Sequence, residues 1–405
     1  MTVPRASSSP RAIHLAGVLI LFGAAYFTSM FFRTVNAILS TQLSVDLGLD
    51  AAALGLMTAA YFLGLGLAQI PIGICLDAYG PRRVQAAMLC VATVGIALFG
   101  LTESVPLLVV ARAMIGVGMA GCLMTAFQVS MLWLTFEKVP LANGLYLAVG
   151  GLGALAATSP VTFLLQFMTW QQMFLMIAVF TLGIAAAIAL VTPEQPSTPG
   201  LPWGARLRSV GVVAQNQRLL RYLPMTALCF ATGTAMQGLW AATWMQSVTG
   251  LDAPVIGWTL AIMAVSLTVG SAVGGVLTVA MERRGLELKH VILASTCLFI
   301  LAEIGLGLFP SEAGVLLWVL FALTYNVVTL SYTHVARSQP RDCIGSSTAL
   351  MNTAVILSTF VVQYGLGLFL SWSGEDNTAF ALISALWALT GLQVAALIWC
   401  CFPRG

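Results

Sequence analysis

Apolar runs of about 20 residues recur from one end of this sequence to the other, and short polar segments separate them. Each run is long enough to cross the roughly 30 Å hydrocarbon core of a bilayer as a helix. The runs lack the two-residue alternation of barrel strands, and a helix satisfies its own backbone polar groups in lipid. The expected spans cover residues 15–42, 52–75, 84–102, 106–133, 142–166, 171–192, 222–247, 254–280, 290–309, 314–336, 345–370 and 379–402.

The composition supports the same interpretation. Hydrophobic residues make up 59% of the chain and charged residues only 8%, whereas a soluble domain carries about 25% charged residues. The first span follows two basic residues, as a signal peptide would, but it is too long and has no cleavage-like site. We therefore predict an all-α membrane protein with twelve transmembrane helices.

The distribution of charge predicts the orientation of these helices. Lys and Arg concentrate in cytoplasmic loops, and here all of them except Arg33 and Arg112 fall on one side of the expected membrane. The opposite loops carry acids such as Asp46, Asp50 and Asp252. This pattern predicts a bacterial inner-membrane protein with both termini in the cytoplasm. The net charge of +3 thus reflects orientation and does not indicate a nucleic-acid partner.

A Pro-rich segment at residues 192–202 interrupts the series of spans after the sixth. We expect an N-terminal six-helix bundle over residues 1–192, a cytoplasmic linker over 193–221 and a C-terminal six-helix bundle over 222–405. The basic sequences at 80–83 and 282–285 lie in corresponding places of the two halves. Such weak internal symmetry is typical of a duplicated transporter fold.

The chain offers no constellation typical of an enzyme. His14, His290 and His334 are scattered, no pair of carboxylates lies within the spans, and the eight cysteines lack metal-binding spacing. We expect neither catalysis, nor a metal, nor a cofactor. The expected partners are the lipid bilayer, a small-molecule solute and a coupling ion, a proton or another, and the expected state is a monomer.

The loop after the second span carries Gly73, Asp77, Gly80, Arg82 and Arg83. A glycine, an aspartate four residues later, a second glycine and a basic pair resemble the loop motif of the major facilitator superfamily. In this interpretation Gly73 permits close helix packing, Asp77 caps or pairs with a neighbouring helix, and Gly80 turns the chain. The alternative is an ordinary basic loop on the cytoplasmic side.

The second half holds only part of this motif, namely Glu282, Arg283, Arg284 and Gly285, and Ala78 replaces a usual basic residue in the first copy. We therefore expect an asymmetric cytoplasmic gate. The sequence from Arg112 to Gly121 in the fourth span, with three glycines, is similar to a second motif of the superfamily. The resemblance covers nearly the whole chain and implies a transporter built from two pseudo-symmetric bundles.

Ionisable side chains within a membrane span indicate function by default. Arg33 lies near mid-depth of the first span, and Tyr26 and Asn36 lie on the same expected face. A guanidinium matches a carboxylate or phosphate well, so this stripe predicts an anion-binding site. Arg112 is a second candidate cation. Packing between helices remains the alternative role for both arginines.

By the same resemblance, the first, fourth, seventh and tenth helices line a central cavity. Polar and aromatic residues share one expected face in the seventh, tenth and eleventh spans. These candidates are Gln237, Trp240, Trp244, Tyr325, Asn326, Asn352 and Gln363. Helix packing alone is the alternative explanation for each stripe.

The remaining titratable candidates are Glu303 in the ninth span and His334 in the tenth. The ninth helix is peripheral by resemblance, so a structural role for Glu303 is favoured over a functional one. The sequence thus predicts a secondary transporter that moves a small organic anion by alternating access. The alternative is an exporter of drugs or other apolar or cationic compounds, which the two tryptophans and the 17 methionines would suit.

Overall fold

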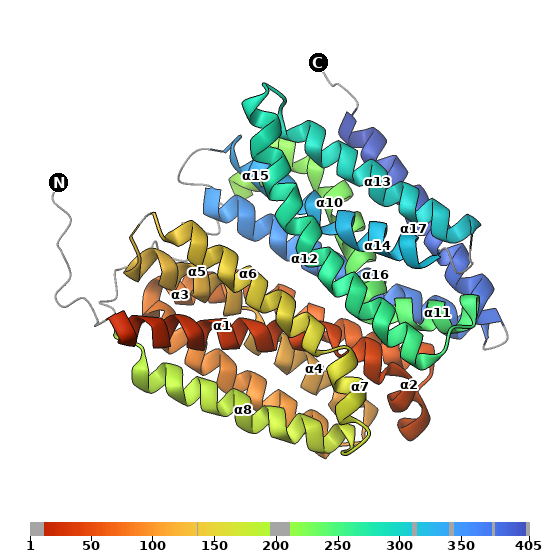
Figure 1. Ribbon diagram of the computed structural model, residues 1–405, viewed down its shortest axis with the longest axis horizontal. Helices are drawn as coiled ribbons and strands as arrows, with labels where there is room; N and C mark the ends of the chain where they lie inside the picture. The colour runs from red at the N-terminus through yellow and green to blue at the C-terminus, as the bar shows by residue number, and fades with distance from the viewer. Residues whose placement is uncertain are drawn as a thin grey trace.

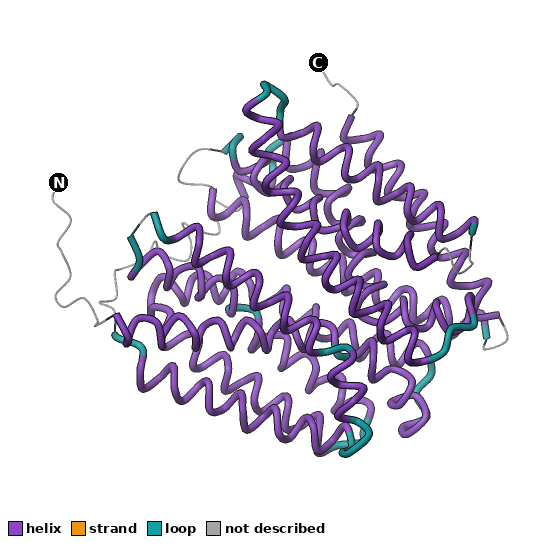
Figure 2. Tube along the Cα trace, in the orientation of Figure 1, coloured by secondary structure: helices purple, strands orange, loops and turns teal. Residues whose placement is uncertain are grey.

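The structure is a computed structural model that describes residues 12–135, 137–194, 211–309, 314–339, 344–374 and 377–401. Every regular element within these ranges is a helix, as Figure 2 shows. The elements are α1 (Ala12–Thr34), α2 (Asn36–Leu47), α3 (Ala51–Leu101), α4 (Val105–Met119), α5 (Cys122–Trp133), α6 (Val139–Ala156), α7 (Ser159–Leu164), α8 (Trp170–Val191), α10 (Gln217–Ala235), η1 (Met236–Trp240), α11 (Ala241–Thr249), α12 (Ala253–Arg283), α13 (Leu288–Leu308), α14 (Gly314–Tyr325), η2 (Asn326–Thr329), α15 (Leu330–Ala336), α16 (Ile344–Ser373) and α17 (Thr378–Cys401).

The helices confirm the predicted fold class. Within the described residues, 11 helices are long and apolar enough to cross a membrane, and they match the expected spans to within a few residues. The seventh expected span is divided, because the π-helical segment η1 separates α10 from α11. In addition, α10 begins with polar residues that include Arg218 and Arg221. Residues 217–221, which the sequence placed in the linker, form the first part of this helix.

Figure 1 shows the helices in two groups, α1–α8 on one side and α10–α17 on the other. Within the first group, α3 packs along α4 and α8, and within the second, α10 packs along α16. The α3–α4 contact is close because glycines face it: a Cβ on Gly64 or Gly116 would collide with the backbone of Ala113 or Tyr61. Small residues allow this approach of backbones in membrane proteins.

The two ends of the bundle differ in charge. Asp46, Asp50 and Asp252 lie where α2 ends and where α3 and α12 begin, and we call this the acidic end. We call the opposite end, with Arg82, Arg83, Arg283, Arg284 and Arg337, the basic end. Two contacts hold the acidic end: Trp170 Nε1 donates to Asp46 Oδ2 at 3.1 Å, and Ser371 Oγ donates to Asp50 Oδ2 at 2.8 Å.

The halves meet most extensively along α3 and α16. Gly55 and Gly367 pack backbone to backbone near the acidic end, and Gly66 packs against Leu357 further along the same pair of helices. A second, smaller contact joins α6 to α12, where Gly151 lies against Thr268. The α3–α16 contact brings the halves together on the side of the acidic end.

Candidate functional site

A cavity of about 850 Å³ lies between the two groups of helices. Its walls come from α1, α5 and α6 of the first half and from α10, η1, α12, α14, η2, α15 and α16 of the second. The lining continues through Thr333 and Ala336 to Arg337 at the basic end. The cavity is thus a central chamber whose lining reaches the basic end, with the halves packed together toward the acidic end.

The structure brings six of the candidate residues to this cavity: Tyr26, Arg33, Gln237, Tyr325, Asn326 and Asn352. Tyr26 and Arg33 come from α1, and the others come from four elements of the second half. The residues that line the cavity include no Asp or Glu. The charged residues of this lining are Arg33 and Arg337, so the chamber is positive in character.

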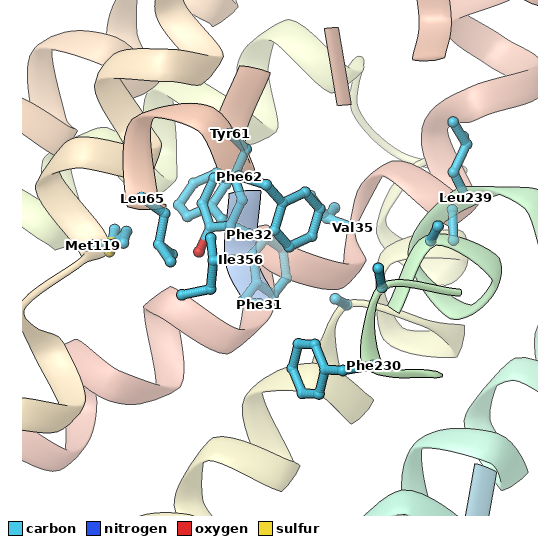
Figure 3. Packing of buried hydrophobic residues seen from close by; sticks show 14 of the residues in the cluster. Phe31, Phe32, Val35, Tyr61, Phe62, Leu65, Met119, Phe230, Leu239 and Ile356 are labelled. Atoms are coloured by element: carbon cyan, nitrogen blue, oxygen red, sulfur yellow. The ribbon is translucent and has the colours of Figure 1, made fainter. Parts of the chain in front are cut away.

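Arg33 lies in the last turn of α1, where the first span breaks before α2 begins at Asn36. Its guanidinium carbon is 5.7 Å from the ring centroids of both Phe62 on α3 and Phe230 on α10. In Figure 3, Phe62 lies among Phe31, Phe32 and Tyr61, whereas Phe230 comes from a separate helix. Arg33 is thus held between aromatic rings of the two halves.

The guanidinium of Arg33 has few polar partners. Nη1 is 4.0 Å from the sulfur of Met30, and Nε is buried without a hydrogen-bond partner. No ion pair among the described residues includes Arg33. A partly buried cation with unused donors is suited to bind an anion that enters the cavity.

The second half supplies neutral hydrogen-bonding groups opposite Arg33. Tyr325 Oη donates to Gln237 Oε1 at 2.9 Å, and Asn326 Nδ2 donates to Ser271 Oγ at 2.7 Å. Gln237 belongs to η1, and the next residue of η1, Gly238, packs against the backbone carbonyl of Arg33. The junction of α1 and α2 therefore packs against η1, and both lie beside the cavity.

Arg112 does not line the cavity. It is fully buried in α4, and its guanidinium carbon lies 4.5 Å from the ring centroid of Phe99 and 5.5 Å from that of Phe174. Two of its nitrogens, Nε and Nη2, have no hydrogen-bond partner. Cation–π contacts with two rings stabilise this charge inside the first half.

Four other candidates lie in helix packing. Asn36 Nδ2 donates to Thr58 Oγ1 at 2.8 Å in the buried interior of the first half. Gln363, with its amide oriented to satisfy both neighbours, accepts from Trp240 Nε1 at 2.9 Å and donates to Ala235 O at 3.3 Å. Trp244 packs edge to face on Trp318, with centroids 6.3 Å apart. The bond from Gln363 to Ala235 occupies a carbonyl at the start of η1.

Several cavity residues were not predicted from the sequence. They are mainly hydroxyl and apolar side chains, including Phe230, Thr234, Thr329, Thr333 and Thr348. The spacing of these residues carried a signal. Thr234 and Gln237 lie four and seven residues after Phe230, and Asn352 lies four residues after Thr348. Residues at these spacings share one face of a helix. Threonine is so frequent in packed membrane helices that this spacing alone did not distinguish it.

The loop motif of the first half connects α3 to the end of α8. Gly80 has a φ of 76° and turns the chain between the second and third spans. Arg82 Nε donates to Ala189 O at 2.8 Å. Arg83 donates to Glu194 and holds the pKa of that exposed carboxyl below its usual range. Both arginines thus bind the C-terminal end of α8.

Two residues of this motif are less informative. A Cβ on Gly73 would meet no atom within 4 Å, so no close helix approach depends on this glycine. The side chain of Asp77 lies outside the described residues.

The second copy of the motif makes a different contact. Glu282 at the end of α12 accepts from Arg337, which follows α15 and lines the cavity. Gly285 has a φ of 81°, and Arg283 and Arg284 are exposed. The ion pairs at the basic end thus differ in place: Arg83–Glu194 lies on the outside of the first half, Glu282–Arg337 at the mouth of the cavity, and Glu287–Lys289 at the start of α13.

Comparisons with known proteins place the chain in a family. The sequence profile of the Major Facilitator Superfamily matches residues 21–363. The probable sulfoacetate transporter SauU of Cupriavidus necator is 23% identical, over 92% of this chain and 90% of that protein. The probable galactarate/D-glucarate transporter GudP of Bacillus subtilis is 19% identical, over 87% of this chain and 85% of its own length.

Solved structures agree with this assignment. A bacterial homolog of the human lysosomal transporter Spinster, in an inward-facing and unoccupied conformation, superimposes with a TM-score of 0.77 at 17% identity, over 96% of this chain and 97% of that chain. The twelve expected spans, the two groups of helices and the central chamber agree with this family. The chain belongs to the Major Facilitator Superfamily and is a multi-pass membrane transporter, not an enzyme.

Proposed function

We propose that this transporter carries a small organic anion, of the carboxylate or sulfonate class, which binds Arg33 in the central cavity. The observation that carries the proposal is the guanidinium of Arg33, which lines the cavity and has no acidic partner among the described residues. A charged donor left without an anion in a membrane interior is costly unless its ligand supplies the charge. The anion would complete the hydrogen bonding that the protein leaves open.

The other cavity groups fit the remainder of such a solute. Gln237, Tyr325, Asn326 and Asn352 offer amide and hydroxyl groups across from Arg33, which suits hydroxyl substituents or a second polar group. The names of the two relatives, a probable sulfoacetate and a probable galactarate/D-glucarate transporter, both refer to small organic acids. Their names support the anion class, and their low identity leaves the individual acid open.

Alternating access follows from the arrangement of the ends. With both termini in the cytoplasm of a bacterial cell, the basic end is cytoplasmic, and the cavity is open to the inside. The α3–α16 contact then forms the outer gate. Transport requires this contact to separate while the halves close at the basic end, where the second half holds the Glu282–Arg337 ion pair at the mouth of the cavity.

Counterflow in proteoliposomes tests the proposal. Vesicles loaded with sulfoacetate, D-glucarate or galactarate would take up the same labelled acid by exchange, and protein-free vesicles would not. Nucleosides serve as neutral solutes and a quaternary ammonium compound as a cationic one. Exchange of at least one acid, without exchange of the cation, is the expected result. Exchange of the cation alone would instead support the drug-exporter alternative, against which stands the absence of acids from the described cavity lining.

A further inference from the structure

A buried carboxylate lies behind the cavity, in a position that the anion site does not use. Glu303 on α13 is 1% exposed, and among the described residues no other Asp or Glu is buried. Gln393 Nε2 on α17 donates to its Oε1 at 3.1 Å, and Thr390 Oγ1 lies 3.0 Å from its Oε2. Neither partner carries a charge, and no described basic side chain forms an ion pair with this carboxyl.

From this geometry, and on the basis of the proposed function, we infer that Glu303 binds the proton that is transported together with the anion. The hydrogen bonds around Glu303 accommodate both protonation states. The hydroxyl of Thr390 has a single proton and lies 2.8 Å from Leu386 O as well as 3.0 Å from Glu303. When that proton is donated to the Leu386 carbonyl, a protonated Glu303 donates to Thr390 Oγ1; when Glu303 is ionised, Thr390 turns its proton to the carboxylate.

The surroundings favour a proton over a metal cation. Gln393 directs its amide nitrogen toward both Glu303 Oε1 and Thr232 Oγ1, the latter at 3.0 Å, and its oxygen has no partner. A sodium site would require oxygen ligands to converge on one point, whereas here a donor points at the carboxyl. The described residues also include no cluster of three or more acidic, cysteine or histidine side chains.

The titratable groups near Glu303 are few. α10 contributes the buried thiol of Cys229, and α17 contributes only neutral groups, Thr390 and Gln393. α14 presents the rings of Phe321 and Tyr325 to Phe299, one turn before Glu303 on α13. The charged groups that α12 and α15 contribute, Glu282, Arg283 and His334, lie at the basic end.

A short path of contacts joins Glu303 to the anion site. Gln393 bridges Glu303 to Thr232 on α10, and Phe230 and Thr234, two residues to either side, line the cavity. Phe230 lies over the guanidinium of Arg33. Protonation of Glu303 would therefore alter the hydrogen bonds that reach Thr232, on the side of α10 that faces away from the cavity. The opposite side of the same helix lines the cavity where the anion would bind.

A proton site would lower the electrical cost of anion uptake. Moving one negative charge into a cell against an inside-negative potential costs about 2.3 kcal/mol per 100 mV. One proton that enters with a monovalent anion cancels this cost; with a dianion such as sulfoacetate, D-glucarate or galactarate it halves the charge that the loaded carrier moves, from two to one. Binding of the anion and of the proton should also favour each other by the same factor.

Proteoliposomes with an imposed pH gradient test the inference. With the lumen one pH unit more alkaline than the bath, we expect wild-type protein to accumulate the exchanged acid up to about tenfold over the level without a gradient, because one proton per anion couples uptake to a driving force of about a factor of ten. Glu303→Gln keeps an uncharged group that Gln393 and Thr390 can bind, so counterflow should persist while accumulation is lost. Glu287→Gln, which removes an exposed carboxylate paired with Lys289, is the matched control and should accumulate normally.

The outcomes separate this inference from the proposed function. Absence of anion counterflow in wild-type protein would contradict the anion proposal itself. Counterflow without any effect of the pH gradient, accumulation driven by sodium, or full accumulation by Glu303→Gln would overturn only the proton site. Proton entry that follows addition of anion to wild-type vesicles, detected with a luminal pH dye, would support the inference independently of whether the variant folds.

Discussion

The two halves of this transporter differ in the charges that they bury. The first half holds two arginines within its spans, Arg33 at the cavity and Arg112 between the rings of Phe99 and Phe174, and neither has an acidic partner among the described residues. The second half holds Glu303, bound only by neutral groups. A pseudo-symmetric fold thus carries cations on one side and a carboxylate on the other.

This difference shows how one cavity divides its tasks. Arg33 supplies positive charge where the solute binds, and the second half supplies neutral hydrogen-bonding groups that do not compete for that charge. The carboxylate is kept behind α10, so it does not neutralise Arg33 or repel an anion. Depth in the membrane alone does not make a charge a binding residue, because Arg112 is as deeply buried as any and lies outside the cavity.

The largest expected effect comes from removing the cation at the cavity. We expect Arg33→Ala to weaken anion affinity about 10- to 100-fold, since hydrogen bonds to charged groups contribute roughly 1.5–3 kcal/mol each. Arg33→Lys should fall between wild type and Arg33→Ala, because an ammonium keeps the charge without the planar fork. The KM for uptake measures this, and Arg83→Ala on the outer surface of the first half is the control. An unchanged KM in Arg33→Ala would show that Arg33 does not bind the anion, and the contrast drawn between the two halves would then be wrong.

A smaller effect is expected from the neutral side of the cavity. Gln237→Leu or Tyr325→Phe should weaken binding about 2- to 10-fold, the range of a neutral hydrogen bond worth roughly 0.5–1.5 kcal/mol. The two residues share one hydrogen bond, so the double variant should lose less than the sum of the single losses. Fully additive losses would show that the two side chains contact the solute separately.

The ion pair at the mouth should affect rates more than affinity. Glu282→Gln frees Arg337 at the edge of the cavity, and we expect the association rate of the anion to rise by about twofold at low salt, because rim charges mainly steer encounter. The increase should disappear at high ionic strength as screening shortens the Debye length. A salt-independent change would instead indicate a rearranged gate.

The smallest effect on the solute is expected for the other arginine. Arg112→Met keeps apolar contact with Phe99 and Phe174, and the KM should stay within about twofold of wild type. Any consequence should appear in the thermal unfolding temperature, since the residue is part of the packing of the first half. A loss of affinity comparable to that of Arg33→Ala would assign Arg112 to the binding site after all.

The sequence predicted the spans well because hydropathy and the position of Lys and Arg respond directly to the bilayer. It placed Trp240 and Trp244 on the same face as Gln237 by assuming 100° per residue. The π-helical segment η1 has a wider turn, and it rotates the following residues away from the cavity. Asn36 lies three residues after Arg33 in the same span, yet its amide donates to Thr58 on α3 and does not line the cavity.

Other features depend on distant contacts. Asn352 and Gln363 share a face of α16, but that face passes from the cavity to Ala235 and Trp240 at the two ends of η1, so of these two residues Asn352 lines the chamber and Gln363 does not. Both Arg33 and Arg112 lie between aromatic rings, and nothing in the local sequence shows that only Arg33 also lines the cavity. Glu303 was assigned to a peripheral helix, and its contact with α10 arises only when α13 and α17 pack together.

The most direct test removes each charge of the proposed pair in turn: the positive charge of Arg33 and the negative charge of the solute. Affinity for an exchanged acid and for its uncharged analogue, in which every acid group is replaced by a primary amide or sulfonamide, would be measured in wild-type protein and in Arg33→Ala. We predict that wild type prefers the acid by at least about 10-fold, as a charge-assisted hydrogen bond would give, and that Arg33→Ala binds the acid and the amide nearly equally. The same preference for the acid in both proteins would contradict the assignment of Arg33 as the anion-binding residue.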